Sequence, residues 1–275
     1  MTEVVSTATT PADGQQIELA DGSVLVSRDG AVLTVTLNNA TNRNAQTPQM
    51  WRAMASVGTS LPLDVRAVIL RADGPSFSAG LDRRMFTEGV PGEKTLIDMV
   101  KSSTEEFDAI IAGYQEAFTC WRNAHAVTVA LVQGHAVGAG FQLALGADIM
   151  IVADDVKLCM KETQLGLVPD LAGTQPLLSA VGYSRALEIC ATGRWVEAEE
   201  AVALGIALSS HPVGELEGSG EALIAEMLTA APGALIETKS LLRDGQYRDR
   251  DSQIVSERVS QRQRINELGS FLTAP

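Results

Sequence analysis

The chain has 275 residues, 45% of them apolar and 20% charged, which is enough to bury a sizeable core as one large domain or as one domain with an appendage. Its 34 acidic and 21 basic residues give a net charge of −13, and no basic patch offsets it, so we expect no binding to nucleic acid or to a membrane. The three cysteines lack CxxC spacing and the three histidines lack ligand spacing, which argues against a disulfide framework and against a metal site.

The first part of the chain has neither a basic segment followed by an apolar one nor an apolar stretch of roughly 18 residues, so we expect a cytoplasmic protein. Residues 1–16 are polar, small and rich in threonine, which predicts a mobile tail. The next segment, "GSVLVSRDGAVLTVTLNN", holds two alternating runs joined at Asp29-Gly30 and predicts a β-hairpin.

Helical and strand signals alternate after this hairpin. A helix is expected to begin at Thr47, whose side chain can cap it, with Pro48 in its first turn. The other predicted elements are strands at 66–72, 126–132 and 148–153 and helices at 104–123 and 138–147. Strands that alternate with helices predict the α/β class with crossover connections, and we assign this core domain to residues 17–210.

Residues 211–275 have a different pattern, because two or three amphipathic helices follow one another with no strand between them. We predict that this region is a helical appendage or an oligomerisation arm.

The stretch "GHAVGAGFQLALGAD" (134–148) begins a predicted helix with small residues directly after a buried strand. Its glycine spacing, GxxxGxG, differs from the dinucleotide fingerprint, and the chain has no GK[ST] phosphate loop. One interpretation is that the small residues only let this helix pack closely on its neighbours.

A second loop, "FSAGLD" (77–82), favours a binding site instead. It also follows a buried strand, and its residues are also small enough to leave backbone N–H groups open to a ligand. Two such N–H groups, one of them at a helix N-terminus, can form an oxyanion hole for a carbonyl oxygen that gains negative charge.

Five segments in order resemble the crotonase, or enoyl-CoA hydratase/isomerase, superfamily: "NRNA" (42–45), "FSAGLD", "GHAVGAGFQLALGADIMIVA" (134–153), "KETQLGLVPDLAGT" (161–174) and "ATGRWVEAEEAVALGIA" (191–207). The resemblance implies an α/β spiral of ββα repeats with a C-terminal helical trimerisation region, and a homotrimer or a hexamer built from two trimers. It implies an acyl-CoA thioester as substrate, as in fatty acid β-oxidation, and no separate cofactor, since coenzyme A is part of the substrate.

The resemblance also implies roles for individual residues. The two oxyanion donors correspond to the N–H groups of Leu81 and Ala139. Contacts with the substrate and its coenzyme A fall on Arg43, Ala45, Ala79, Gly80, Asp82, Arg83, Arg84 and Gly138. A guanidinium suits phosphate, although a surface arginine is more often simply solvated.

The acid and base positions distinguish this chain from the family's hydratases, which use two glutamates to add water. The first position holds Gln142, whose amide cannot take or give a proton at neutral pH. The second holds Glu162, and Asp170 lies in the loop where some family isomerases carry their proton-transferring carboxylate. We therefore expect double-bond isomerisation, with Asp170 as proton carrier and Glu162 as second acid/base or orienter.

Other interpretations of these residues stay open at this point. Glu162 could be an ion-pair partner of Lys161 or of an arginine, and Asp170 could cap a helix ahead of "AGTQPLL". The chain could instead be a hydratase in which Glu162 alone positions the water and Gln142 assists, or a non-catalytic acyl-CoA-binding protein.

Nucleophilic catalysis has weaker support. Ser76 and Ser78 have no evident histidine partner in the sequence, and Cys159 lies in a predicted strand.

Overall fold

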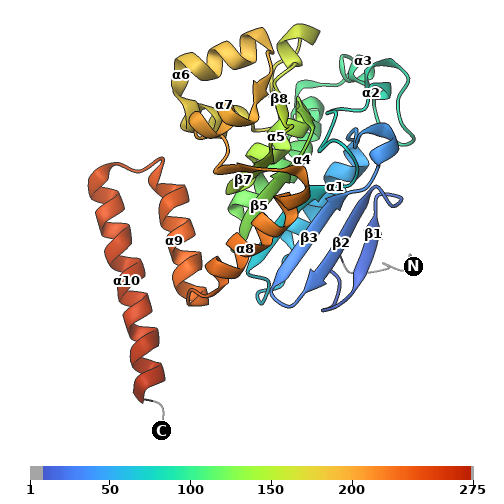
Figure 1. The fold of residues 1–275 in the computed structure, drawn as a ribbon. Helices are drawn as coiled ribbons and strands as arrows, with labels where there is room; N and C mark the ends of the chain where they lie inside the picture. The colour runs from blue at the N-terminus through green and yellow to red at the C-terminus, as the bar shows by residue number, and fades with distance from the viewer. Residues whose placement is uncertain (1–8, 274–275) are drawn as a thin grey trace.

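The computed structural model describes residues 9–273, with side chains described for residues 9–268. At its centre lies a seven-stranded sheet of order β1-β2-β3-β4-β5-β7-β10 (Figure 1). Its strands are β1 (Gln16–Leu19), β2 (Val24–Asp29), β3 (Val32–Leu37), β4 (Ala67–Ala72), β5 (Val127–Val132), β7 (Ile149–Ala153) and β10 (Ser209–His211). The first three are antiparallel, which confirms the predicted hairpin, and the strands from β3 onward are parallel.

A second sheet holds the short strands β6 (His135–Val137), β8 (Lys157–Cys159) and β9 (Val196–Glu197) in the order β6-β8-β9. The main-sheet strands β5 and β7 turn within a few residues into β6 and β8, and each pair then leads into a helix. After β4 the chain makes the same turn, because Ser78 forms a parallel bridge with Ala136 of β6. This repeated strand–strand–helix unit confirms the predicted α/β spiral.

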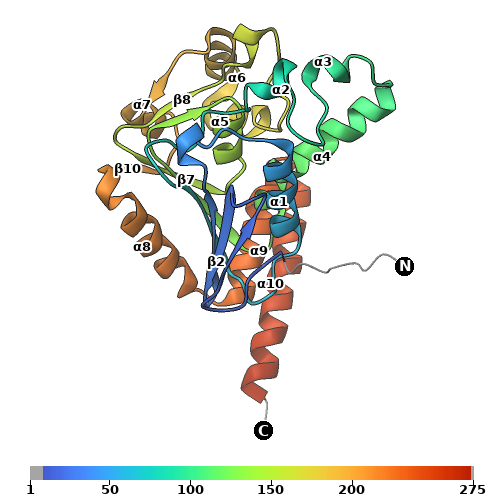
Figure 2. The ribbon, with the colours of Figure 1, turned by 90° about the vertical axis from the view of Figure 1, so that its right-hand side faces the viewer.

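Helices cover both faces of the main sheet. Helices α1 (Pro48–Thr59) and α4 (Thr104–Asn123) cover one face, and α8 (Leu216–Leu228) covers the other, as Figure 2 shows for α1 and α8. Alternate residues of β4 point to opposite faces: Val68 and Leu70 belong to the core under α1 and α4, whereas Ile69 packs in the cluster that contains Leu216 and Ile224 of α8.

The remaining helices are short or peripheral. They are η1 (Ala40–Asn42), α2 (Arg84–Thr87), α3 (Leu96–Met99), α5 (Ala139–Leu145), η2 (Glu162–Leu165), α6 (Thr174–Thr192), α7 (Ala198–Ala203), η3 (Val213–Glu215), α9 (Pro232–Gly245) and α10 (Arg250–Thr273).

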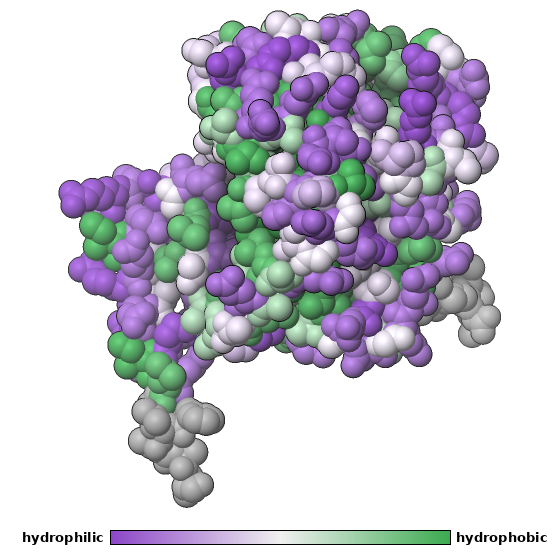
Figure 3. All heavy atoms as spheres, in the orientation of Figure 1, coloured by the Kyte–Doolittle hydropathy of each residue, from purple (hydrophilic) through white to green (hydrophobic). Residues whose placement is uncertain are grey.

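The C-terminal region does not separate from the core at residue 210 as a single unit. Helix α8 buries Leu216 and Ile224 on the sheet, so it is part of the core although the sequence placed it in the appendage. Helices α9 and α10 do project from the body as a pair (Figure 1), with apolar side chains among the polar ones on their surface (Figure 3). Their role in oligomerisation stays a prediction.

The predicted mobile tail falls partly outside the described residues, which begin at residue 9. Within the described part, the Asp13 carboxylate accepts a hydrogen bond from the Gly30 N–H (2.6 Å) and Gln16 begins β1, so this part is bonded to the hairpin. No helix within residues 9–273 has both the length and the apolar composition to cross a membrane.

Candidate active site

The two small-residue loops lie directly against each other. Gly80 has a φ of +87°, and a Cβ atom there would lie 2.5 Å from the Val137 carbonyl oxygen and 3.7 Å from the Ala139 nitrogen. A Cβ atom on Gly140 would lie 2.6 Å from the Ser78 carbonyl oxygen. Close packing is therefore real, and it brings the two predicted oxyanion donors into the same region.

Both predicted donors are unpaired. The Gln46 N–H donates to Gly80 O (2.7 Å) and Gln46 O accepts from the Asp82 N–H (2.8 Å), so the intervening Leu81 N–H points away from Gln46. Ala139 is the first residue of α5, where the N–H has no partner within the helix. Neither N–H has a hydrogen-bond partner in the described part of the chain.

The carboxyl group of Glu162 lies beside the start of α5. Gly138 has φ +51° and ψ −117°, and a Cβ atom there would lie 3.1 Å from Glu162 Oε1. Glu162 is buried, and its Oε1 accepts from Gln142 Nε2 at 2.7 Å. Its Oε2 is buried without a partner among the described residues, and Lys161 bonds elsewhere, so the ion-pair interpretation of Glu162 is wrong.

Gln142 joins three segments of the site. Its side chain is 1% exposed, its Nε2 donates to Glu162, and its Oε1 accepts from the Leu171 N–H (3.0 Å) and the Gly173 N–H (3.2 Å). The two backbone donors fix which end of the amide carries oxygen. The Gln142 amide therefore holds the loop after η2, and the Glu162 carboxyl, at fixed positions beside α5.

Asp170 lies half-buried in this same loop. Helix α6 begins at Thr174 after Gly173, with no side-chain cap, so the prediction that Asp170 caps a helix is wrong. Burial raises the pKa of Asp170. Burial also raises the pKa of Glu162, and the neighbouring negative charge of Asp170 raises it further. The two carboxyls therefore titrate in one environment that favours their protonated forms.

Hydrogen bonds clamp the turn that carries Glu162 to the end of α6. Thr163 Oγ1 donates to Cys190 O (2.6 Å), Lys161 Nζ to Gly193 O (2.5 Å), and Gln164 Nε2 to Thr192 O. These acceptors belong to a segment that is fixed in turn by the Arg194 guanidinium.

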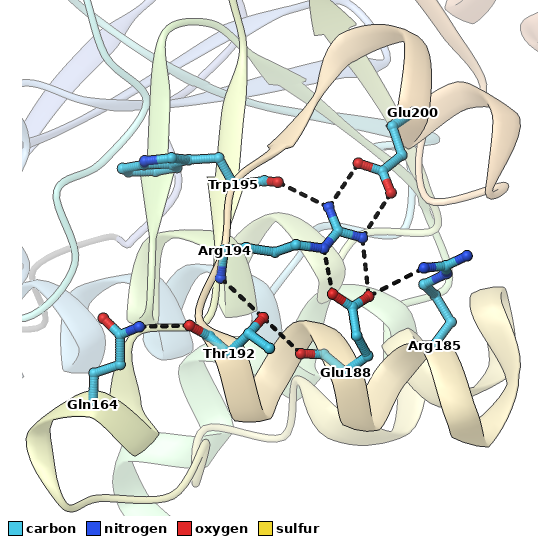
Figure 4. A network of polar contacts seen from close by, with 7 residues as sticks. All are labelled: Gln164, Arg185, Glu188, Thr192, Arg194, Trp195 and Glu200. Carbon is cyan, nitrogen blue, oxygen red and sulfur yellow. Dashed lines mark hydrogen bonds and ion pairs between the residues drawn. The ribbon is translucent and has the colours of Figure 1, made fainter.

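Figure 4 shows this Arg194 guanidinium between the carboxylates of Glu188 in α6 and Glu200 in α7. Its Nη2 lies 3.0 Å from Glu188 Oε2 and 2.7 Å from Glu200 Oε1. The arginine of the motif "ATGRWVEAEEA" thus has a structural role, because its ion pairs connect α6 with α7 next to the segment that bonds the Glu162 turn.

The residues assigned to coenzyme A are only partly open to solvent. Asp82 is 3% exposed, and its carboxylate accepts from Arg84 Nη2 (2.8 Å) and Asn42 Nδ2 (3.2 Å). The Arg84 side chain, half exposed, is thereby held beside the first loop. Arg43 and Arg83 are exposed. The other assigned residues divide into exposed Ala79 and buried Ala45, Gly80 and Gly138.

Sequence reasoning missed Asn44, which is fully buried under the first loop. Its Nδ2 donates to Asp73 O (2.8 Å) and Ser76 O (2.9 Å), and its Oδ1 accepts from the Asn39 N–H (2.7 Å). Only its place within the "NRNA" motif marked it in the sequence.

The nucleophile candidates do not form a catalytic arrangement. Burial raises the pKa of the Cys159 thiol to about 12, which leaves it protonated. Ser78 is fully buried. Ser76 does have a histidine nearby, since its Oγ lies 3.4 Å from His135 Nδ1, but this is long for a hydrogen bond. Within residues 9–273 no cluster of His, Cys, Asp or Glu side chains could hold a metal ion.

Comparison with known proteins identifies the family of this chain. Residues 27–268 match a family model described as enoyl-CoA hydratase/isomerase. A Thermus thermophilus protein named as an enoyl-CoA hydratase is 34% identical over 221 residues, which covers 78% of this chain and 81% of the relative.

Two crystal structures of a Thermobifida fusca protein named as an enoyl-CoA hydratase are also similar. The structure with CoA bound shares 44% identity, has a TM-score of 0.87 and covers 92% of this chain and 96% of that one. The structure with acetoacetyl-CoA bound shares 42% identity, with a TM-score of 0.86 and coverage of 90% and 97%.

Proposed function

Because the chain belongs to the enoyl-CoA hydratase/isomerase family, we propose that it binds an unsaturated acyl-CoA thioester and moves a double bond along the acyl chain through an enolate. The observation that carries this proposal is the unpaired, buried Oε2 of Glu162 beside the unpaired N–H of Ala139. A carboxyl that can take part in proton transfer and an anion-stabilising N–H thus lie at the same end of α5.

The reaction needs only groups that this chain supplies. The thioester oxygen accepts from Leu81 N–H and Ala139 N–H, a carboxylate takes a proton from C2 of a 3-enoyl-CoA, and the electron pair moves into a dienolate. Reprotonation at C4 leaves the double bond between C2 and C3 and restores the carboxylate. Each oxyanion donor contributes about 3 to 4 kcal/mol to stabilising the dienolate.

We assign Asp170 as the proton carrier and Glu162 as the second acid/base or orienter. Burial raises the pKa of both carboxyls, which makes each one a better proton acceptor than an exposed carboxylate, as a group that takes a proton from carbon must be. Gln142 cannot exchange a proton, and both ends of its amide are already bonded to protein atoms. It therefore supports the site without replacing the missing glutamate of a two-carboxylate hydratase.

Hydration of a 2-enoyl-CoA is the second candidate function. Relatives at 34% and 44% identity carry the name of that activity, and Glu162 alone could position the water. A non-catalytic acyl-CoA-binding protein is the third, although two carboxyls in an environment that raises their pKa values count against it.

The test follows conjugation by absorbance with 3-enoyl-CoA and 3,5-dienoyl-CoA, and loss of conjugation with 2-enoyl-CoA. We expect turnover of a 3-enoyl or 3,5-dienoyl substrate, abolished in Asp170→Asn with acyl-CoA affinity retained. Asp154→Asn, at an exposed aspartate, is the matched control. Robust hydration of 2-enoyl-CoA with no turnover of the other two would contradict isomerisation, and a Gln142→Glu variant that gains hydratase activity would identify the lost function.

We further propose that Arg43, Arg84 and the loop residues assigned above contact coenzyme A. We also propose that the protein acts in fatty acid β-oxidation. Finally, we propose that it is cytoplasmic and assembles as a homotrimer or hexamer. Apolar side chains that are at least half exposed on α9 and α10 support the assembly: Leu242, Val259, Ile265 and Leu268. Light scattering should give a mass three or six times that of the chain, and a monomer would contradict this part.

A further inference from the structure

We propose that Gln46 is a positioning residue of the oxyanion hole: with Trp51 and Ser78 it forms a buried hydrogen-bond chain that fixes the direction of the Leu81 N–H. This inference rests on the proposed function only in the use of Leu81 as an oxyanion donor. It concerns residues that the proposed reaction does not otherwise use.

Gln46 holds the first loop with its backbone and with its side chain. Its backbone bonds to Gly80 O (2.7 Å) and to the Asp82 N–H (2.8 Å) lie on either side of Leu81. Its side chain is fully buried, donates from Nε2 to Ser78 Oγ (3.1 Å), and accepts at Oε1 from Trp51 Nε1 (2.7 Å).

The chain of bonds has a single direction. The Trp51 indole can only donate, so the oxygen of the Gln46 amide must face it and the NH₂ group must face Ser78. Ser78 Oγ also accepts from the Gly80 N–H (3.2 Å) and donates to Asn44 O (2.7 Å). The hydroxyl thus uses its one proton and both of its acceptor sites, so the direction of every bond in the chain is set.

This arrangement restricts the peptide that carries the oxyanion donor. A rotation of the peptide planes around Leu81 would break the Gly80 and Asp82 bonds to Gln46, and a shift of Gly80 would break its bond to Ser78. The loop is therefore fixed before a substrate arrives, and an oxyanion donor is effective because it needs no reorganisation during the reaction. The Gln46 side chain is fully buried, with Nε2 and Oε1 each bonded to a protein atom, so it acts on the site through the loop and not by contact with substrate.

Ring packing holds the first member of the chain in place. Trp51 contacts Tyr114 and Phe118 of α4, with ring-centroid distances of 4.9 Å and 5.6 Å. The position of the Leu81 N–H thus depends on the packing of α1 against α4.

The experiment compares Gln46→Leu and Ser78→Ala with Gln49→Leu, a glutamine nearby whose exposed side chain bonds Asp21. Acetoacetyl-CoA is the probe, because an oxyanion hole stabilises its enolate, which has its own absorbance. We expect the enolate fraction of the bound probe, and kcat, to fall roughly tenfold to a hundredfold in both test variants. KM and the pH profile of kcat should stay close to those of Gln49→Leu, because the carboxyls are untouched, and the Kd of the probe should rise by no more than the lost enolate accounts for.

The outcomes separate this inference from the proposed function. An enolate fraction unchanged in Gln46→Leu and Ser78→Ala overturns the positioning role alone. A wild-type protein that binds the probe without forming enolate overturns the oxyanion hole as well. If Gln46→Leu does not fold, Ser78→Ala and Trp51→Phe decide the question by the same readout. Trp51→Phe keeps an aromatic ring but removes the indole N–H.

Discussion

Replacing Gly138 with alanine should damage the site in two ways that can be separated. The residue has φ +51° and ψ −117°, a combination that side chains disfavour, which costs about 1 to 3 kcal/mol of folding free energy. For a chain of this size the midpoint of thermal unfolding should fall by roughly 2 to 10 °C. The new Cβ would also lie 3.1 Å from Glu162 Oε1, so the carboxyl or the start of α5 must move by a few tenths of an ångström.

We expect this displacement to lower kcat about tenfold, which corresponds to about 1.4 kcal/mol of activation free energy. Gly30→Ala is the matched control, because Gly30 has a φ of +55° with nothing within 4 Å of its Cβ position and lies in the β2–β3 hairpin. The assays are thermal unfolding and steady-state kinetics on the same preparations. If Gly138→Ala loses stability as Gly30→Ala does but keeps the wild-type kcat, the contact between Glu162 and the start of α5 has no role in catalysis.

Two further variants report on buried charge. Burial raises the pKa of Glu162 in the folded protein, so folding is penalised as the pH rises through that pKa and is not penalised below about pH 4, where the carboxyl is protonated in both states. Glu162→Gln should therefore be inactive but more thermostable than the wild type at about pH 8. This gain in thermal stability should vanish at low pH. A difference in unfolding midpoint that is the same at both pH values would contradict the reasoning. Lys239→Met removes the ammonium that bonds Asp148 Oδ2 (2.7 Å) and leaves that carboxylate buried, at an expected cost of about 3 to 5 kcal/mol in urea unfolding. Adding Asp148→Asn should recover part of this loss, and a single-variant loss below about 1 kcal/mol would mean that the pair behaves as an exposed one.

Local patterns predicted most of the elements correctly. The Asp29-Gly30 hairpin is present, Thr47 caps α1 by accepting from the Met50 N–H, and α4 spans Thr104–Asn123 as expected. These elements depend on turn residues, caps and hydrophobic periodicity, all of which are local properties of the sequence.

The second sheet could not be predicted in the same way. Its strands β6 and β8 have three residues each and β9 has two, which is too short for an alternating pattern to stand out. They are stabilised by pairing between distant residues, such as His135 with Lys157 and Leu158 with Val196. The assignment of α8 to the appendage failed for a related reason, because an amphipathic helix does not reveal which surface its apolar side will cover.

The sequence by itself determined the family resemblance, the two small-residue loops and the absence of a second glutamate at Gln142. Only the tertiary structure decided what that glutamine does. Its bonds reach Glu162, Leu171 and Gly173, which lie 20, 29 and 31 residues along the chain. Likewise, the bond from Gln46 to Ser78 spans 32 residues. A side chain's chemistry is written in its residue type, but its hydrogen-bond partners depend on which distant backbone segments the packed core brings within about 3 Å.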